Sequence, residues 1–400
     1  MKRSEALHYA NAAHFLDHFF LLIFPTAALA IAPAWGQSYA DILLLGSPLY
    51  VAFALGTLPA GWLGDRYDRL QLLGVFFLGC GLSCLIIAWS AGPVSLMTGL
   101  ALLGGFAALY HPVGLPLVTD VGARTGRALA VNGVFGNLGL AASAAATGFL
   151  SAWFGWQAAF AVPGVLSAVL GIALLIRHRP GSPIIPGSTA DAGRASAGSD
   201  RRTLMIVACV VLAAALFGGF VFNAVTISLA KFFDERLGGL AGNLSWVGAS
   251  AGLVFAVAAF AQLPVGEVLD RLGARPILIF LLTGQITLLV CLSQLTGWWA
   301  FALSMLLVTM LFAEIPVTTW LISRYVPSGA RSRVISVEYV LSLGMTSGAV
   351  PLLAAMHGAG FGFNIQFVLL AGAAGLVLVA AVFLPAHRIR TFPRGSQMAR

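Results

Sequence analysis

Long apolar runs separated by short polar segments dominate the pattern of this chain. Each run is close to the roughly 20 residues that a helix needs to cross a bilayer, and glycine and proline are tolerated inside such helices. The pattern therefore predicts an all-α integral membrane protein with twelve spans. The predicted spans are 9–33, 42–63, 72–91, 95–118, 128–150, 158–176, 204–230, 244–265, 276–295, 298–322, 334–356 and 365–385.

The composition excludes a soluble globular protein. Hydrophobic residues make up 59% of the 400 positions and charged residues only 9%, whereas an ordinary soluble chain is about 25% charged. Residues 1–34 resemble a signal peptide, since Lys2 and Arg3 precede an apolar stretch. Polar His14 and Asp17 interrupt that stretch, so we expect it to remain as the first span.

The basic residues predict the orientation. Twenty of the 22 Lys and Arg residues lie in the termini and in alternate loops, on one side of the predicted membrane; Lys231 and Arg236 lie on the other. Positive charge stays on the cytoplasmic side, so we expect both termini inside a bacterial inner membrane that the chain crosses many times. The net charge of +8 is then explained by the orientation of the chain in the membrane. The sequence contains no run of basic residues with aromatic residues between them, so we expect no nucleic-acid partner.

The chain divides into two related halves. Residues 177–203 are rich in Pro, Gly, Ser and Ala and carry five arginines, which predicts a flexible cytoplasmic linker between residues 1–176 and 204–400. The segment from Leu58 to Arg66 recurs 205 positions later with five identical residues, and Arg127 recurs as Arg333. Duplicated six-span halves are typical of one transporter architecture.

The repeated segment resembles the hallmark of the major facilitator superfamily, Gly-x-x-x-Asp-Arg-x-Gly-Arg-Arg/Lys. The first copy departs from the hallmark at Asp68, which replaces the second glycine, and at Leu70, which replaces the last basic residue. The resemblance implies a secondary transporter that works by alternating access, with spans 1, 4, 7 and 10 around a central cavity. The matching gate residues are Gly61, Asp65, Arg66, Arg69, Gly266, Asp270, Arg271 and Arg275.

The motif can act as a latch. Asp65 at a helix end can face the positive N-terminus of a helix from the other half, while Arg66 and Arg69 make charge-assisted bonds. The alternative is that these charges only anchor a loop at the interface. Glu338 lies near the same surface, and we expect it to pair with a gate arginine rather than with substrate.

Polar residues at membrane depth mark the candidate site, because ionisable groups there are costly and by default functional. His14, Asp17 and His18 share one face of span 1, which must point into the bundle. The spans expected to line the cavity add His111 in span 4, Asn223 in span 7 and Glu314 in span 10. We hypothesise that these six residues bind substrate and a coupling ion. The alternative is a set of hydrogen bonds that fixes helix packing.

The chemistry of these groups favours proton coupling without any cofactor, since a carboxylate beside histidines offers protonation sites near neutral pH. No Lys or Arg lies in the middle of a predicted span, so a cargo recognised by bidentate arginine, such as a phosphate, is disfavoured. A polar first span with His111-Pro112 in span 4 resembles the fosmidomycin-resistance type of efflux protein. Span 5 shows glycines at intervals of three without the Gly-Pro pair of many antiporters, which indicates close packing and leaves antiport open.

The main prediction is a monomeric, proton-coupled efflux protein for a drug or metabolite. The strongest rival is transport of a transition metal or its chelate, for which His14, Asp17, His18 and His111 are suitable ligands; no Met-rich or Cys-rich motif supports it. A receptor or scaffold would not need doubled gate motifs. An enzyme is disfavoured, because no nucleophile–base pair or phosphate loop occurs in the sequence.

Overall fold

The computed structural model of the 400-residue chain describes residues 2–121, 125–178, 201–238, 243–326 and 328–385. Most of the predicted linker and the last fifteen residues of the chain lie outside these ranges. The helices are α1 (Arg3–Trp35), α2 (Tyr39–Leu45), α3 (Ser47–Arg66), α4 (Arg69–Ala88), α5 (Pro93–Ala107), α6 (Tyr110–Val121), α7 (Thr125–Phe154), α8 (Trp156–Arg177), α9 (Arg201–Ala213), the π-helix η1 (Ala214–Gly218), α10 (Gly219–Arg236), α11 (Leu244–Ala258), α12 (Gln262–Leu272), α13 (Ala274–Leu292), α14 (Gly297–Tyr325), α15 (Ser328–Gly358) and α16 (Phe363–Val382).

The twelve predicted spans are confirmed. The described residues contain twelve helical segments that are long and apolar enough to cross a membrane, and each overlaps one predicted run. Four spans consist of more than one helix, namely spans 2, 4, 7 and 8. In span 4 the helix ends at Ala107 and restarts at Tyr110. Pro112 explains part of this break, because proline has no N–H to bond the carbonyl four residues back.

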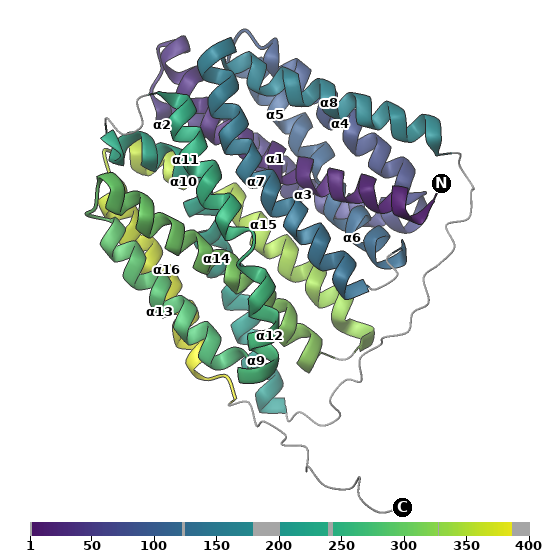
Figure 1. The fold of residues 1–400 in the computed structure, drawn as a ribbon, viewed down its shortest axis with the longest axis vertical. Coiled ribbons are helices and arrows are strands. Elements are labelled where there is room, and N and C mark those ends of the chain that lie inside the picture. The colour runs from purple at the N-terminus through teal and green to yellow at the C-terminus, as the bar shows by residue number, and fades with distance from the viewer. Residues whose placement is uncertain (1, 122–124, 179–200, 239–242, 327, 386–400) are drawn as a thin grey trace, which may run out of the picture.

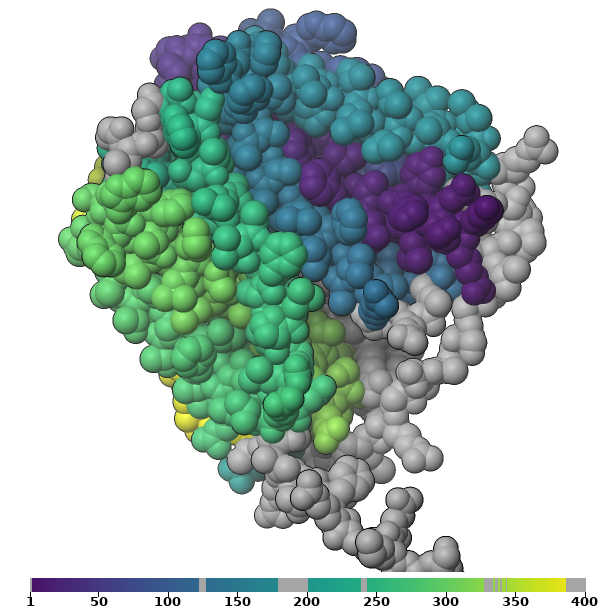
Figure 2. Space-filling view, viewed as in Figure 1, coloured from purple at the N-terminus to yellow at the C-terminus, as the bar shows by residue number. Residues whose placement is uncertain are grey.

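The two halves of the chain form two helical bundles that lie side by side (Figure 1). The N-half comprises α1–α8 and the C-half comprises α9–α16. In the space-filling view the N-half lies toward the upper right and the C-half toward the lower left, and the two meet at the upper left (Figure 2). The end at which they meet carries the chain segments around Tyr39, Glu235 and Gly358, and we call it the joined end.

Small residues let the helices of the two halves touch at the joined end. A Cβ atom on Gly148 of α7 would lie 2.6 Å from the carbonyl oxygen of Leu244 and 2.8 Å from the Cα of Gly248 in α11. A Cβ on Gly252 would lie 2.8 Å from the carbonyl oxygen of Ala141. Membrane helices associate through close backbone packing of this kind. The α7–α11 pair is therefore a glycine-based joint between the halves.

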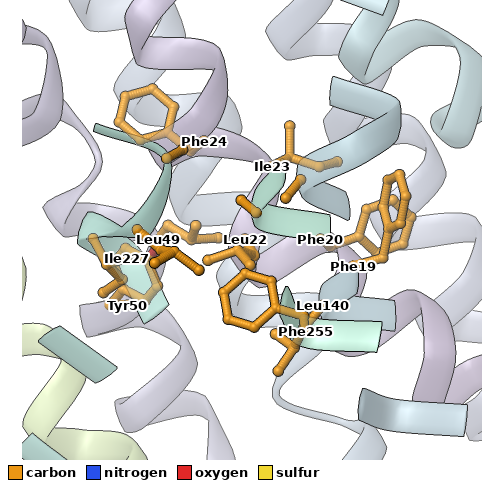
Figure 3. Packing of buried hydrophobic residues seen from close by; sticks show 14 of the residues in the cluster. Phe19, Phe20, Leu22, Ile23, Phe24, Leu49, Tyr50, Leu140, Ile227 and Phe255 are labelled. Carbon is orange, nitrogen blue, oxygen red and sulfur yellow. The ribbon is translucent and has the colours of Figure 1, made fainter. Parts of the chain in front are cut away.

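Buried apolar residues divide into two clusters. The first contains residues of both halves, and Figure 3 shows part of it, with Leu22, Leu49 and Tyr50 of the N-half near Ile227 and Phe255 of the C-half. The C-half members of this shared cluster come from the joined end of the bundle. Among the described residues, the second cluster is built from the C-half alone and fills the opposite end of that half. The two halves thus share a core at one end.

Candidate functional site

The polar face of α1 points into the N-half, as the sequence predicts. Asp17 is fully buried and His14 is 7% exposed, while Asn11 and His18 are half-buried. The apolar positions around them pack into the shared core, including Leu16, Phe20 and Ile23. A polar stripe on a membrane helix cannot face lipid. The apolar packing around it keeps the polar face of α1 turned toward the interior of the bundle.

The ring of His14 is fixed on three sides. Its Nδ1 lies 2.8 Å from the carbonyl oxygen of Asn132 in α7. The ring of Tyr110 stacks on it with centroids 4.7 Å apart. Gly136 of α7 lies against its other edge, where a Cβ would come within 2.5 Å of Nε2. The glycine at position 136 is therefore required for this imidazole to fit between α1 and α7.

Asn132 is the residue around which the N-half site is organised. It is fully buried, and its side-chain oxygen accepts a 2.9 Å hydrogen bond from the hydroxyl of Tyr110. Its amide nitrogen donates to the side-chain oxygen of Asn11 at 3.0 Å. These bonds connect α1, α6 and α7, and they hold the backbone carbonyl that His14 contacts.

His111 and Asp17 form a buried pair. Nε2 of His111 lies 3.2 Å from Oδ2 of Asp17, and both side chains are almost inaccessible to solvent. His111 lies in the first turn of α6, directly after the break in span 4. A buried carboxylate is expensive unless a proton or a cation partner accompanies it. The break in span 4 thus positions His111 beside the carboxylate of Asp17.

Three imidazoles converge at this point. Nε2 of His14 lies 3.2 Å from Nε2 of His18, one helical turn along α1. One ring nitrogen each from His14, His18 and His111 lies within 4.8 Å of the other two. With Asp17 beside them, these residues form the group that we call the histidine cluster.

Glu314 does not join the histidine cluster. It is buried in α14, where the amide nitrogen of Gln285 in α13 donates a 2.8 Å hydrogen bond to Oε2. Its Oε1 faces η1, since a Cβ on Gly218 would lie 3.2 Å from it. π-helical turns widen a helix locally and are frequent at functional sites. Glu314 therefore has its own polar environment inside the C-half.

Asn223 also has partners within the C-half. Its amide nitrogen donates to the carbonyl oxygen of Gly219 at 2.8 Å and to that of Ser342 in α15 at 3.1 Å. The structure therefore brings together four of the six predicted site residues and places the other two among C-half partners.

The first gate motif makes contacts inside the N-half. The guanidinium of Arg66 lies 4.0 Å above the ring of Trp62, and Arg69 pairs with Asp120 at the end of α6. A Cβ on Gly61 would approach Pro112 at 3.9 Å. Asp65 is exposed, so the predicted contact with the other half remains a prediction for a conformation closed at this end.

Asp68, one of the two departures from the hallmark in the first copy, caps a helix. Its carboxylate accepts hydrogen bonds from the backbone N–H groups of Leu70 and Gln71 and so caps the N-terminus of α4. Nε2 of His178, just after α8, lies 2.9 Å from the same oxygen. The substitution thus stabilises the start of span 3.

The second gate motif likewise contacts its own half. Asp270 accepts a 3.0 Å hydrogen bond from the indole N–H of Trp320, and Arg271 pairs with Glu267 one turn earlier. A Cβ on Gly266 would meet nothing within 4 Å, and Arg275 is half-buried at the start of α13.

Glu338 lies within hydrogen-bonding reach of Thr318 on α14. Its expected pairing with a gate arginine therefore remains a prediction. Sequence reasoning missed Asn132 and Gln285, which hold the two buried acid–base sites. An amide at mid-span was the available signal, since amides as well as charges are costly in lipid.

Comparisons with known proteins agree with this architecture. Residues 10–257 match the sequence profile described as Major Facilitator Superfamily. The puromycin resistance protein pur8 of Streptomyces alboniger is 34% identical over 155 residues, which are 37% of this chain and 28% of that protein. A probable 4-methylmuconolactone transporter of Cupriavidus pinatubonensis is 26% identical over 279 residues, which are 66% of this chain and 63% of that protein.

The fold matches solved transporter structures. A bacterial homologue of the human lysosomal transporter Spinster, in an inward-facing and occupied conformation, superposes with a TM-score of 0.70 at 16% identity. The match covers 96% of this chain and 94% of that one. This chain spans less than two thirds of the length of the two named sequence relatives, so the solved structure is the more complete likeness, and it is a likeness of fold.

Proposed function

The chain belongs to the major facilitator superfamily and is a membrane transporter of small substrates, and on that premise we propose that it is a proton-coupled exporter of a drug or metabolite. The family and fold are those of a transporter rather than an enzyme. The proposal assigns the coupling to the histidine cluster of the N-half.

The observation that carries the proposal is the burial of Asp17 against His111. The carboxylate is fully buried, and the imidazole of His111 lies 3.2 Å from it. An ionised carboxylate in this environment needs a proton or a cation. Histidine is the side chain whose charge changes between pH 5 and 8. A proton taken up by this pair alters its charge at the centre of the N-half.

The shared core supports alternating access. The halves share apolar contacts at the joined end, and the basic residues predict that the opposite end faces the cytoplasm. The structure would then be open toward the cytoplasm. Rocking of the two halves about the cluster would expose it to each side in turn, and the gate motifs would come together only in the alternate conformation.

Two observations support export of an uncharged or cationic cargo. The likeness to a puromycin resistance protein covers 37% of this chain, and no lysine or arginine lies in the middle of a predicted span. A transporter for phosphates or dicarboxylates would be expected to hold a fixed positive charge there. Proton entry in exchange for cargo would make the protein an antiporter.

The test is accumulation of cargo in cells with and without the protein. Puromycin, other candidate antibiotics and labelled transition metals are compared side by side, each with and without a proton-gradient uncoupler. We expect lower retention of one antibiotic in cells that carry the protein, and loss of that difference with uncoupler. Equal retention of every antibiotic, or export that survives the uncoupler, would contradict the proposal.

The matched variant is Asp17→Asn, which keeps the shape of the side chain and removes its charge and proton. We expect proton-driven export to be lost while the amount of protein in the membrane is unchanged. Asp41→Asn is the control, because Asp41 is an exposed residue near the start of α2. Normal export by Asp17→Asn would contradict the role of the cluster.

A further inference from the structure

The histidine cluster has the composition and spacing of a metal-binding site. Three imidazole nitrogens lie within 4.8 Å of one another, and a carboxylate oxygen of Asp17 lies 3.2 Å from His111. Imidazole suits divalent first-row transition metals, and the absence of thiolate among these three ligands removes the bias toward Cu(I). The three imidazoles come from α1 and α6, two helices that pack on each other within the N-half.

The protonation of His14 is determined by its surroundings. Its Nδ1 faces the carbonyl oxygen of Asn132 at 2.8 Å, and a carbonyl can only accept a hydrogen bond. Nδ1 must therefore carry the proton, which leaves the lone pair of a neutral ring on Nε2. Metal-bound histidines usually have their other ring nitrogen bonded in this way, because the bond fixes both the tautomer and the ring direction.

The lone pair on Nε2 of His14 accepts a hydrogen bond from Nε2–H of His18, and the two nitrogens are 3.2 Å apart. An ion bound between the two rings would replace that proton. Two nitrogens bound to one tetrahedral zinc ion at about 2.0–2.1 Å each would be separated by about 3.3–3.4 Å. The observed separation is thus close to that of two ligands sharing an ion, before any movement of the chain.

Asp17 supplies a buried negative charge beside His111. The side chain is fully buried, and its Oδ1 has no hydrogen-bond partner among the described residues. A buried carboxylate oxygen left without a partner is costly, and a nearby cation lowers that cost. A divalent ion between the three imidazoles would have three protein donors, with the negative charge of Asp17 beside one of them.

The site is also rigid on the side of His14. Tyr110 stacks on its ring, Gly136 leaves room for its edge, and Asn132 is fixed by bonds to Tyr110 and Asn11. His18 is half-buried and is the most exposed of the four, so it marks the side from which an ion can arrive. A prearranged ligand with one adjustable neighbour is the form expected of a site that both binds and releases its ion.

We propose that His14, His18 and His111 bind one divalent first-row transition-metal ion, with Asp17 as the buried negative charge next to His111. The inference deepens the proposed function and rests on it in one respect: the ion would occupy the site that is assigned there to the proton. The cation class that would bind at the centre of the N-half is thus the divalent transition metals.

The test uses the purified full chain in detergent with Co²⁺ and Zn²⁺ as probes. Tetrahedral Co²⁺ gives visible absorption bands that report its ligand geometry, and Zn²⁺ should remove them by competition. We expect one ion per chain. His14→Gln and His18→Gln should each weaken binding by at least about 100-fold, above the 10- to 100-fold typical of residues that only support a ligand. His8→Gln, an exposed position on the same helix, should bind Co²⁺ as the parent does.

The absence of saturable Co²⁺ binding at one ion per chain would overturn the inference, and so would binding that survives in the His14→Gln/His18→Gln double variant. Elution as a monodisperse protein shows that each variant is folded. If His14→Gln does not fold, His18→Gln carries the test because its ring is partly exposed. Proton-driven export without Co²⁺ binding would overturn this inference alone, whereas Co²⁺ binding without proton-driven export would overturn the proposed function and leave the inference standing.

Discussion

The two halves share one helical plan but use it differently. In the N-half, three imidazoles converge between α1 and α6, and one of them, His111, pairs with Asp17. In the C-half, Glu314 accepts a hydrogen bond from Gln285, and the amide nitrogen of Asn223 donates to two backbone carbonyls. The N-half thus gathers a set of titratable groups in one place, whereas the C-half holds Glu314 and Asn223 among separate partners.

One pair of positions shows how the repeat was adapted. Gly136 on span 5 makes room for the ring of His14 on span 1. The residue 206 positions later is Ser342 on span 11, and here the space is provided from the opposite side, since a Cβ on Gly219 of span 7 would lie 2.7 Å from the serine Oγ. In the N-half the glycine is on span 5 and faces a larger residue on span 1, whereas in the C-half the glycine is on span 7 and faces a larger residue on span 11. Only the N-half arrangement accommodates an imidazole.

After Asp17→Asn, the largest effect should come from breaking the joint between the halves. In Gly148→Leu, a side chain would enter the space now occupied by the backbone of Leu244 and Gly248, so the joined end cannot close. We expect transport by proteoliposomes to fall at least about 100-fold, or about 2.7 kcal/mol in the barrier. Gly372→Leu is the control because a Cβ there meets nothing within 4 Å; equal loss in both variants would mean general damage.

A smaller loss of transport is expected from a glycine substitution at the N-half site, while a glycine substitution on the corresponding C-half helix should have no effect. Gly136→Ala would displace the His14 ring, since the new Cβ would lie 2.5 Å from Nε2, and overpacking of this kind costs about 1–3 kcal/mol. We expect proton-driven transport to fall roughly 10- to 100-fold. Gly344→Ala, on the C-half helix that carries Ser342, has open space around the new methyl group and should transport normally. The comparison fails if the two variants behave alike.

Glu314→Gln tests whether the C-half takes part in coupling. The amide can still accept the hydrogen bond from Gln285, so packing is preserved and only the ionisable group is lost. We expect transport to fall by about tenfold or less, or about 1.4 kcal/mol, against the complete loss expected for Asp17→Asn. Initial rates in proteoliposomes with an imposed pH gradient give the ratio. A loss as complete as that of Asp17→Asn would show that both halves carry coupling.

The smallest effect should come from losing a single cation–π contact at the joined end. Lys231 of α10 lies 5.2 Å from the ring centroid of Tyr39 in α2, a contact between the halves worth about 0.5–1 kcal/mol. Lys231→Ala should therefore shift the balance between open and closed states about two- to fivefold. Disulfide formation between cysteines at Ala40 and Gly358, which approach each other there, measures the closed state. Lys2→Ala should leave cross-linking unchanged, and an unchanged yield in Lys231→Ala would remove the contact from the gate.

The spans could be predicted from the sequence because length and hydropathy are local properties. Span 1 is one example: its apolar run predicts the helix, and its polar stripe predicts that His14 and Asp17 face inward. The break before His111 was less visible, since proline is tolerated in many membrane helices without ending them. The arrangement of the halves depends on contacts such as Gly148 with Gly248, which a single sequence does not pair.

The site could be predicted in part for the same reason. Asp17, His18 and His14 share a helix face, so their proximity follows from helical geometry. Asn132 is more than 100 residues away from His14, and only the packing of α7 on α1 brings its carbonyl to the ring. Glu314 has the right depth, but depth does not determine which neighbour it faces; the partner is Gln285 on α13.

The division of the apolar core determines how much work each transport cycle requires. The second cluster is complete within the C-half, so that end of the half can swing without exposing its own interior. The contacts that must part are those between the halves within the shared cluster and at the glycine joint. The work of each cycle is therefore concentrated at the joined end, where the two halves separate.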